Sequence, residues 1–235
     1  MDKSNIGSLF DRIAGSYDSL NHLLSLGIDR SWRRKAVKGM RKCRSVLDVA
    51  IGTADLTLEL LRQGKTQRVT GLDLSANMIQ IGRIKAGKEG VAAKVKFIQG
   101  SALQMPFDDA AFDAVTCGYG VRNFSDLDKG LAEMNRVLKA GGELMILEFS
   151  YPTNRFVRSV YDLYFTHIMP FVGRILSRDK KAYTYLNRSV KSFIWGDEMC
   201  RHIEQAGFTE ATHQPLTFGI TTIYRAFKPD IKQRQ

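Results

Sequence analysis

Five short apolar segments alternate with amphipathic stretches between residues 45 and 149, and this rhythm limits the possible folds more than any other feature. The apolar segments predict strands at residues 45–50, 68–73, 95–99, 112–117 and 143–149. The amphipathic stretches predict helices at residues 56–61, from residue 76 after an N-cap at Ser75, and at 126–138. Such alternation is typical of a mostly parallel sheet with helices on both faces, so we predict an α/β, doubly wound, Rossmann-like domain.

The segments outside this alternation predict a helical cap, a helical lid and the end of the sheet. Residues 1–40 predict the cap, because apolar residues recur there at helical spacing before a basic segment. Residues 151–195 are aromatic and basic without a strand signal, which predicts inserted helices. Residues 197–206 predict an amphipathic helix that ends at Gly207. Residues 208–212 and 218–227 predict two strands that form a hairpin-like pair around Pro215. We therefore predict a single domain over residues 1–235 with a seven-stranded sheet.

The charge and the cysteine content limit the partners. Lys and Arg number 35 against 24 Asp and Glu, and the net charge of +11 favours an anionic partner such as nucleic acid or a lipid headgroup surface. The three cysteines are widely spaced and the four histidines form no cluster, so we expect neither a disulfide scaffold nor a metal. The chain lacks a secretory signal pattern, and charged residues interrupt its most apolar later segment, residues 160–176. We expect a soluble or peripheral protein of a reducing interior.

Small and acidic residues follow the predicted strands, where doubly wound sheets bind their ligands. The first turn, residues 48–54 (DVAIGTA), contains one glycine, Gly52. It lacks the GxGxxG pattern that binds a pyrophosphate. Asp73 ends the second strand, where a carboxylate can accept hydrogen bonds from both ribose hydroxyls, and Ser101 and Ala102 follow the third strand near an expected adenine. Loop capping and an ordinary tight turn are the structural alternatives. Taken together, these residues predict a nucleoside pocket that fits S-adenosylmethionine better than NAD.

Several longer motifs resemble one family. Residues 17–21 (YDSLN), followed by Ser25 and Trp32, and residues 136–150 (RVLKAGGELMILEFS) resemble the two signatures of the ubiquinone/menaquinone biosynthesis C-methyltransferase family (UbiE/MenG type). Residues 120–123 (GVRN) and 104–107 (QMPF) are also similar to that family. The resemblance extends from about residue 10 to about residue 227. This chain departs from the family pattern where it has Leu20, Asp29 and Ala140 in place of Met, His and Pro, so no role that needs a histidine at position 29 can be inherited.

The resemblance implies a class I methyltransferase that binds S-adenosylmethionine. It places the methionine end of this cofactor near Thr53 and the ribose on Asp73. Ser101 and Ala102 are expected to lie around the adenine. Gly118 stands where relatives often have a serine that touches the cofactor, which leaves a side-chain contact there in doubt. The full set of expected cofactor-binding residues is Asp48, Gly52, Thr53, Asp73, Ser101, Ala102 and Gly118.

The reaction implied by the resemblance is methylation of a ring carbon of a prenylated quinol. Demethylmenaquinol is the expected substrate, and 2-polyprenyl-6-methoxy-1,4-benzoquinol is the alternative. The reaction needs close positioning, a proton acceptor and a cation beside the phenolate. Arg122 is the candidate cation, with a loop-organising salt bridge as its alternative role. Tyr17 and Asp18 lie in the cap, where Tyr17 could instead serve only helix packing. Asp18, or a water held by Arg122, is the candidate proton acceptor.

The lid is expected to meet a membrane. Aromatic residues that alternate with cations suit an interfacial element that admits an isoprenoid tail, and an ordinary helical insert is the structural alternative. We expect a prenylated quinol and the inner face of a membrane as partners of a cytoplasmic, peripheral enzyme, and no nucleic acid; a homodimer is left open. The competing functions are an RNA methyltransferase, a nicotinamide-dependent oxidoreductase and a regulator that only binds the cofactor.

Overall fold

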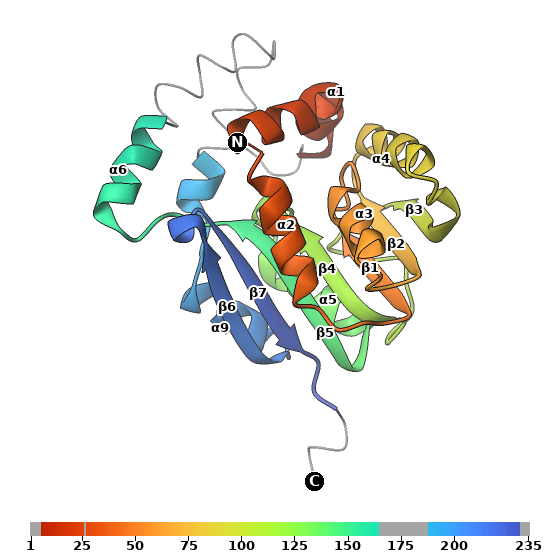
Figure 1. The fold of residues 1–235 in the computed structure, drawn as a ribbon. Helices are drawn as coiled ribbons and strands as arrows, with labels where there is room; N and C mark the ends of the chain where they lie inside the picture. The colour runs from red at the N-terminus through yellow and green to blue at the C-terminus, as the bar shows by residue number, and fades with distance from the viewer. Residues whose placement is uncertain (1–5, 26, 165–187, 231–235) are drawn as a thin grey trace.

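Seven strands form one sheet in the computed structural model of the chain, which describes residues 6–25, 27–164 and 188–230. Their order is β3-β2-β1-β4-β5-β7-β6 (Figure 1). The first five strands are parallel, and β7 runs antiparallel to both β5 and β6. The predicted α/β doubly wound sheet is therefore confirmed. The strands are β1 (Ser45–Val49), β2 (Arg68–Asp73), β3 (Val95–Gln99), β4 (Phe112–Gly118), β5 (Leu138–Phe149), β6 (Thr209–Leu216) and β7 (Thr221–Phe227).

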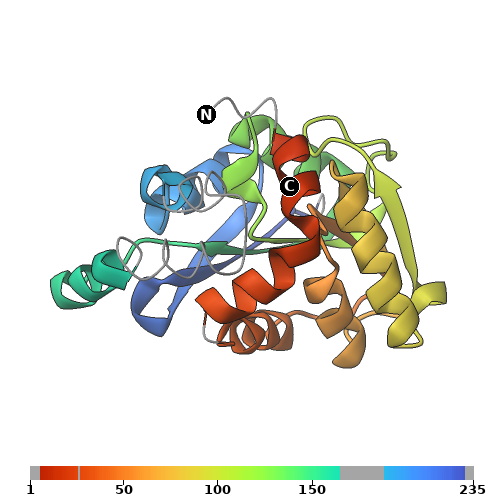
Figure 2. The same cartoon turned by 90° about the horizontal axis from the view of Figure 1, so that it is seen from above.

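Helices cover both faces of the sheet (Figures 1 and 2). Apolar residues of α2 and α3 pack on one face, whereas those of α5 and α9 pack on the other. α1 lies across the end of the sheet where the parallel strands finish, and it contacts α4 and α2. The helices are α1 (Ile6–Leu24), α2 (Asp29–Lys38), α3 (Asp55–Arg62), α4 (Ala76–Lys88), α5 (Leu127–Val137), α6 (Arg155–Leu163) and α9 (Asp197–Gln205). Short 3₁₀ turns occur at η2 (Ala92–Lys94), η3 (Val121–Asn123) and η5 (Thr217–Gly219).

The central strand β1 shows how the alternation of side chains places a polar group in the core. Leu47 and Val49 pack in the cluster beneath α5 and α9, whereas Val46 packs in the cluster beneath α2 and α3. Because successive strand residues point to opposite faces, Asp48 shares the face of Val46 and lies toward α3. The carboxyl group of Asp48 therefore lies in the core and needs polar partners on α3 or the neighbouring strands.

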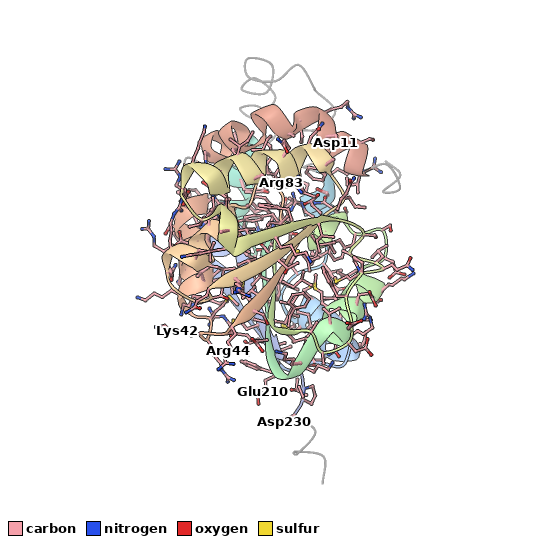
Figure 3. The ribbon with its side chains drawn as sticks, turned by 90° about the vertical axis from the view of Figure 1, so that its right-hand side faces the viewer. Asp11, Lys42, Arg44, Arg83, Glu210 and Asp230 are labelled. Atoms are coloured by element: carbon pink, nitrogen blue, oxygen red, sulfur yellow. The ribbon has the colours of Figure 1, made fainter. Side chains whose placement is uncertain are left out.

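The cap is held over the sheet by polar contacts to the start of α4. Ser75 caps α4, as predicted, because its Oγ accepts a hydrogen bond from the backbone N–H of Met78 at 3.1 Å. The same hydroxyl donates to the carboxylate of Asp11 in α1, which also accepts from the backbone N–H of Asn77 at 3.2 Å. Figure 3 shows Asp11 at this end of the molecule and Lys42 and Arg44 near the opposite end. One N-cap thus joins the cap helix to the sheet.

Two local predictions were wrong in detail. Pro215 lies inside β6 opposite Thr222, and the chain reverses at η5 instead. Proline is tolerated there because β6 is the edge strand and needs fewer donors. Gly141 and Gly142 belong to β5, which begins at Leu138; Gly141 has a φ of +72° beside a register shift in the β4–β5 pairing. The two glycines are therefore an irregularity within a longer strand, which begins at Leu138 and not at the predicted residue 143.

Two described stretches of the predicted lid are helical. α6 and a short helical stretch at residues 188–192 belong to it, and residues 165–187 of the predicted lid lie outside the described residues. Within the described ranges, no helix combines the length and the apolar character that crossing a membrane would require.

Candidate active site

A cavity of about 310 Å³ lies at the carboxyl ends of β1, β2, β3 and β4, and α1 contributes to its wall. Residues from these strand ends and from α1 line it together, although they are far apart in the sequence. Eight of the ten site residues that the sequence predicts are on this wall: Tyr17, Asp48, Gly52, Thr53, Asp73, Ser101, Ala102 and Gly118. Asp18 and Arg122 are the two that do not line it.

Asp73 is the carboxylate around which the first two loops are arranged. One of its oxygens, Oδ2, accepts from the backbone N–H of Gly52 at 2.8 Å, and Oδ1 accepts from that of Ser75 at 2.9 Å. Burial raises the pKa of Asp73, while these backbone donors oppose the rise. Each carboxylate oxygen can accept more than one hydrogen bond, so Asp73 can hold the loops and still accept bonds from a ligand hydroxyl.

Asp48 is almost completely buried and binds two hydroxyls. Thr57 of α3 donates to its Oδ2 at 2.6 Å, and Thr116 of β4 donates to its Oδ1 at 2.8 Å. Burial raises the pKa of Asp48 to about 6, against the effect of these hydroxyls. The carboxylate is thus a junction between β1, α3 and β4 at the floor of the cavity.

The loops after β3 and β4 give the cavity backbone rather than long side chains. Ser101 Oγ accepts from the backbone N–H of Leu103 at 3.1 Å, which folds the loop around Ala102. At Gly118 a Cβ atom would lie 3.2 Å from Leu56, which is tighter than most packed contacts. This wall therefore presents backbone where the family resemblance implied a serine.

A chain of alternating charges joins the cap to the first turn. Lys85 of α4 lies 2.8 Å from Asp18 of α1 and also pairs with Asp55 of α3. Thr53 donates to the same Asp18 at 2.6 Å. The three charged side chains are each about three-quarters buried, so solvent screens their attraction less than it screens a surface pair.

Arg33 of α2 extends this chain. Its guanidinium lies 3.1 Å from Asp55 and also binds Asp29. Asp29 further accepts from Ser25, and His22 lies 2.8 Å from it. Burial opposes ionisation of Asp29, but Ser25 and Arg33 outweigh burial and lower its pKa. Among the described residues, His22, Asp29 and Asp55 have ligand atoms close enough together for a metal ion, yet Arg33 already supplies the cation for both carboxylates.

Arg122 is buried in an ion pair beside the cavity. Its guanidinium donates to Glu148 and to the carbonyl of Tyr119, each at 2.6 Å, and its own backbone N–H donates to Glu148 at 3.2 Å. Glu148 also accepts from the backbone N–H of Phe149 at 2.8 Å. An arginine held in this way organises the loop after β4, which is the alternative that the sequence left open. A direct contact of Arg122 with a substrate oxygen stays a prediction.

Aromatic side chains continue from the cavity wall toward α2. Tyr119 lines the cavity with a φ of +59°, and its ring packs against Phe149 with centroids 4.5 Å apart. Phe149 meets Trp32 edge to face at 6.4 Å. On the cap side, burial raises the pKa of Tyr17, so its hydroxyl stays protonated and can donate a hydrogen bond. A left-handed backbone at Tyr119 is the kind of strain that is often found at functional sites.

The sequence did not single out three residues that organise this site. Lys85 and Arg33 lie in helices that carry several exposed cations, so their burial leaves no signal in the pattern. Glu148 does leave one, because it is an acidic residue at the end of an otherwise apolar strand, where burial requires a partner.

The charges on the cavity wall decide which cofactor it suits. Among the described residues that line it, three have carboxylates, Asp48, Asp55 and Asp73, and one is a cation, Arg33. Such a wall disfavours the phosphates of a dinucleotide and favours a ligand that carries positive charge. S-adenosylmethionine has a sulfonium, an ammonium and ribose hydroxyls, so the residues present fit this cofactor.

Comparison with known proteins also indicates a methyltransferase. The model of the ubiE/COQ5 methyltransferase family matches residues 1–228. A Bacteroides fragilis protein named demethylmenaquinone methyltransferase is 43% identical over 225 residues, which cover 95% of this chain and 92% of that protein. A Geobacter sp. (strain M21) protein named ubiquinone/menaquinone biosynthesis C-methyltransferase UbiE is 43% identical over 222 residues, covering 93% of this chain and 94% of that protein.

A solved structure supports the fold. A SAM-dependent methyltransferase of Thermotoga maritima matches with a TM-score of 0.66 at 19% identity, over 94% of this chain and 99% of that chain. At this identity the likeness shows the fold alone.

We predict that Asp48→Asn changes stability in a pH-dependent way. The native state raises the pKa of this carboxyl from about 4 to about 6, so wild-type stability falls as the pH rises through that interval. Asparagine cannot titrate, and the variant should gain up to about 3 kcal/mol relative to wild type between pH 4 and pH 7. Urea unfolding of both proteins at each pH measures this difference. A stability difference between the two proteins that does not vary with pH would contradict the raised pKa of Asp48.

We also predict that Lys85→Met loosens the cap. Loss of the ammonium leaves Asp18 and Asp55 without their shared cation, which should cost about 1–2 kcal/mol, between surface and buried ion pairs. Amide hydrogen exchange in α1 should therefore become faster, while exchange in β4 and β5 stays slow. Lys88→Met, an exposed change on the same helix, is the control. Equal exchange in α1 of the two variants would show that the charge chain does not hold the cap.

Proposed function

The chain belongs to the ubiE/COQ5 methyltransferase family and is an S-adenosylmethionine-dependent C-methyltransferase, and from that premise we propose that it converts demethylmenaquinol to menaquinol. The observation that carries this proposal is the full-length similarity to relatives named demethylmenaquinone methyltransferase, at 41–43% identity in three genera. A second substrate, 2-polyprenyl-6-methoxy-1,4-benzoquinol, is favoured by the equally similar Geobacter relative, whose name includes ubiquinone.

The cofactor supplies an electrophilic methyl group carried on a sulfonium. In our proposal Asp73 binds the ribose hydroxyls, Ser101 and Ala102 flank the adenine, and the turn with Gly52 and Thr53 faces the methionine end. Their common position on one cavity wall supports this assignment. Asp48 and the backbone of Gly118 complete the expected contacts.

The acceptor is a ring carbon that becomes nucleophilic when the neighbouring phenol loses its proton. We propose that Tyr17 positions the quinol, because it lines the cavity and burial raises the pKa of its hydroxyl, which therefore stays protonated. Arg122 and Glu148 would position the ring indirectly, because they hold the loop after β4 in place. Arg122 also stays our candidate for the cation near the phenolate. Two candidates remain for the proton acceptor. We propose the water held by Arg122, because Asp18 already binds Thr53 and Lys85.

We also propose that the enzyme works at the cytoplasmic face of a membrane, because an isoprenoid tail partitions into lipid. Arg155 and Arg158 of α6 belong to the described part of the lid and can attract anionic headgroups. Lys180 and Lys181, two further cations within the predicted lid, lie outside the described residues. A homodimer remains an alternative for its assembly.

We predict that Asp73→Asn weakens the binding of S-adenosylhomocysteine by roughly 1–3 kcal/mol, because a ribose hydroxyl loses its charged acceptor. Isothermal titration calorimetry of the purified protein measures this, and thermal unfolding checks that the variant is folded. Asp230→Asn, at the far end of the molecule, is the control (Figure 3). The wild type should give no heat with NAD; micromolar binding of NAD in place of S-adenosylhomocysteine would overturn the cofactor assignment.

We predict that this chain restores methylated menaquinone in a bacterial strain that lacks its own demethylmenaquinone methyltransferase. Chromatography and mass spectrometry of the lipid quinones would show demethylmenaquinone replaced by menaquinone. Restoration of ubiquinone alone, in a strain that makes both quinones, would favour the benzoquinol as the substrate. An unchanged quinone pool, with the protein present and folded, would refute both substrates.

A further inference from the structure

Exposed apolar side chains gather where three segments of the fold meet. Seven large apolar side chains are exposed among the described residues, and five of them belong to the start of α2, to η5 and to α6. The segments are joined by hydrogen bonds: Trp32 Nε1 of α2 donates to Thr217 Oγ1 at 2.7 Å, and Ser150 Oγ, before α6, donates to the carbonyl of Gly219 at 2.8 Å. Figures 1 and 2 show α6 and the β6–β7 connection on the same side of the molecule. The five side chains are Ile28, Phe156, Val160, Leu163 and Phe218.

Phe218 is the least expected of these side chains. It is 78% exposed and has a φ of +58°, between Thr217 at +45° and Gly219 at +88°. A left-handed backbone costs a bulky residue free energy, and an exposed ring gains little from burial to offset that cost. Asparagine or glycine would fit this turn better. The fold therefore gives no reason for a phenylalanine here, and backbone strain of this kind points to a function.

The outer face of α6 has the same character. Phe156, Val160 and Leu163 are spaced four and three residues apart, so they lie on one side of the helix, and they are 78%, 53% and 60% exposed. Tyr161 on the other side is buried. Arg158 donates to the carbonyl of Pro152 at 2.9 Å, which fixes the start of the helix. α6 is thus an amphipathic helix whose apolar face meets solvent.

The charges around these side chains are complementary to an anionic surface. Arg30, two residues after Ile28, and Arg155, beside Phe156, are exposed. The neighbouring acids are engaged within the protein, because Asp29 is buried against Arg33, and Asp162 binds Lys191 and Tyr151. Aromatic and aliphatic groups beside cations are typical of elements that bind the interface of an anionic bilayer.

We propose that Ile28, Phe156, Val160, Leu163 and Phe218 form a docking surface that inserts into the headgroup region of an anionic lipid bilayer, with Arg30 and Arg155 at its rim. This inference rests on the proposed function, because a long-tailed quinol must be collected from lipid. In this proposal the contact with lipid is largely apolar and comes from the start of α2, η5 and α6 together, not from the cations of the lid alone. Phe218 then has a role that explains its strained backbone.

Sedimentation with vesicles of phosphatidylglycerol and phosphatidylcholine tests the proposal. Phe218→Asn should reduce vesicle binding about tenfold, and Phe156→Ser combined with Phe218→Asn should reduce it further. Ile84→Ser, an exposed apolar residue of α4 outside the three segments, is the matched control and should bind as the wild type does. Phe218→Asn should also keep or raise the unfolding temperature, because asparagine accepts the left-handed backbone. Arg30→Gln with Arg155→Gln should weaken binding mainly at low salt.

The outcomes separate this proposal from the proposed function. Loss of vesicle binding in Phe218→Asn, with unchanged activity on a short-tailed, water-soluble quinol, supports both. Wild-type vesicle binding in the double variant overturns the docking surface and leaves the enzyme assignment intact. No activity of the wild type on any quinol would refute the function while the vesicle result is judged on its own. Self-association of the wild type that Phe218→Asn abolishes, without vesicle binding, would assign the surface to a second copy and overturn the proposal.

Discussion

The carboxylate of Asp73 is the constraint on which the site depends. It accepts the backbone N–H of Gly52 from the first turn and that of Ser75 at the start of α4, so the ends of β1 and β2 are held in one arrangement. Ser75 in turn caps α4 and binds Asp11 of the cap helix. A buried carboxylate is costly unless donors surround it, and here the donors are the loops themselves. The loops that form the wall of the cavity thereby hold one another in place through this carboxylate.

Charge pairing adds a second layer of order around the same cavity. Lys85 and Arg33 each join two carboxylates from different helices, and together they connect α1, α2, α3 and α4. Acidic groups still outnumber cations on the cavity wall, which gives it a preference for a positively charged ligand. The Arg33–Asp55 pair belongs to the wall itself, whereas Lys85 and Asp18 lie behind it, so the same ion pairs hold the helices together and set the charge that a ligand meets.

The regular part of the fold follows from local pattern, and its exceptions follow from contacts that are distant in the sequence. Arg68–Asp73 and Val95–Gln99 are strands with the predicted bounds, because apolar runs between turn residues need no further information. The strand-end position of Asp73 also follows from pattern. By contrast, the burial of Lys85 and Arg33 depends on which helices become neighbours, and the position of the β6–β7 turn depends on its contact with Trp32. The neutralisation of Arg122 by Glu148, 26 residues away, is equally invisible in a local window.

The position of α1 constrains the order in which the chain can fold. Its partners, among them Thr53, Ser75 and Lys85, all come later in the sequence. During synthesis this helix therefore emerges before its docking surface exists, and a helix in a protein gains most of its stability from such packing. Docking must wait until β1, β2, α3 and α4 have assembled. α1 is thus synthesised before its partners but docks after them, and its part of the cavity wall is added only at that step.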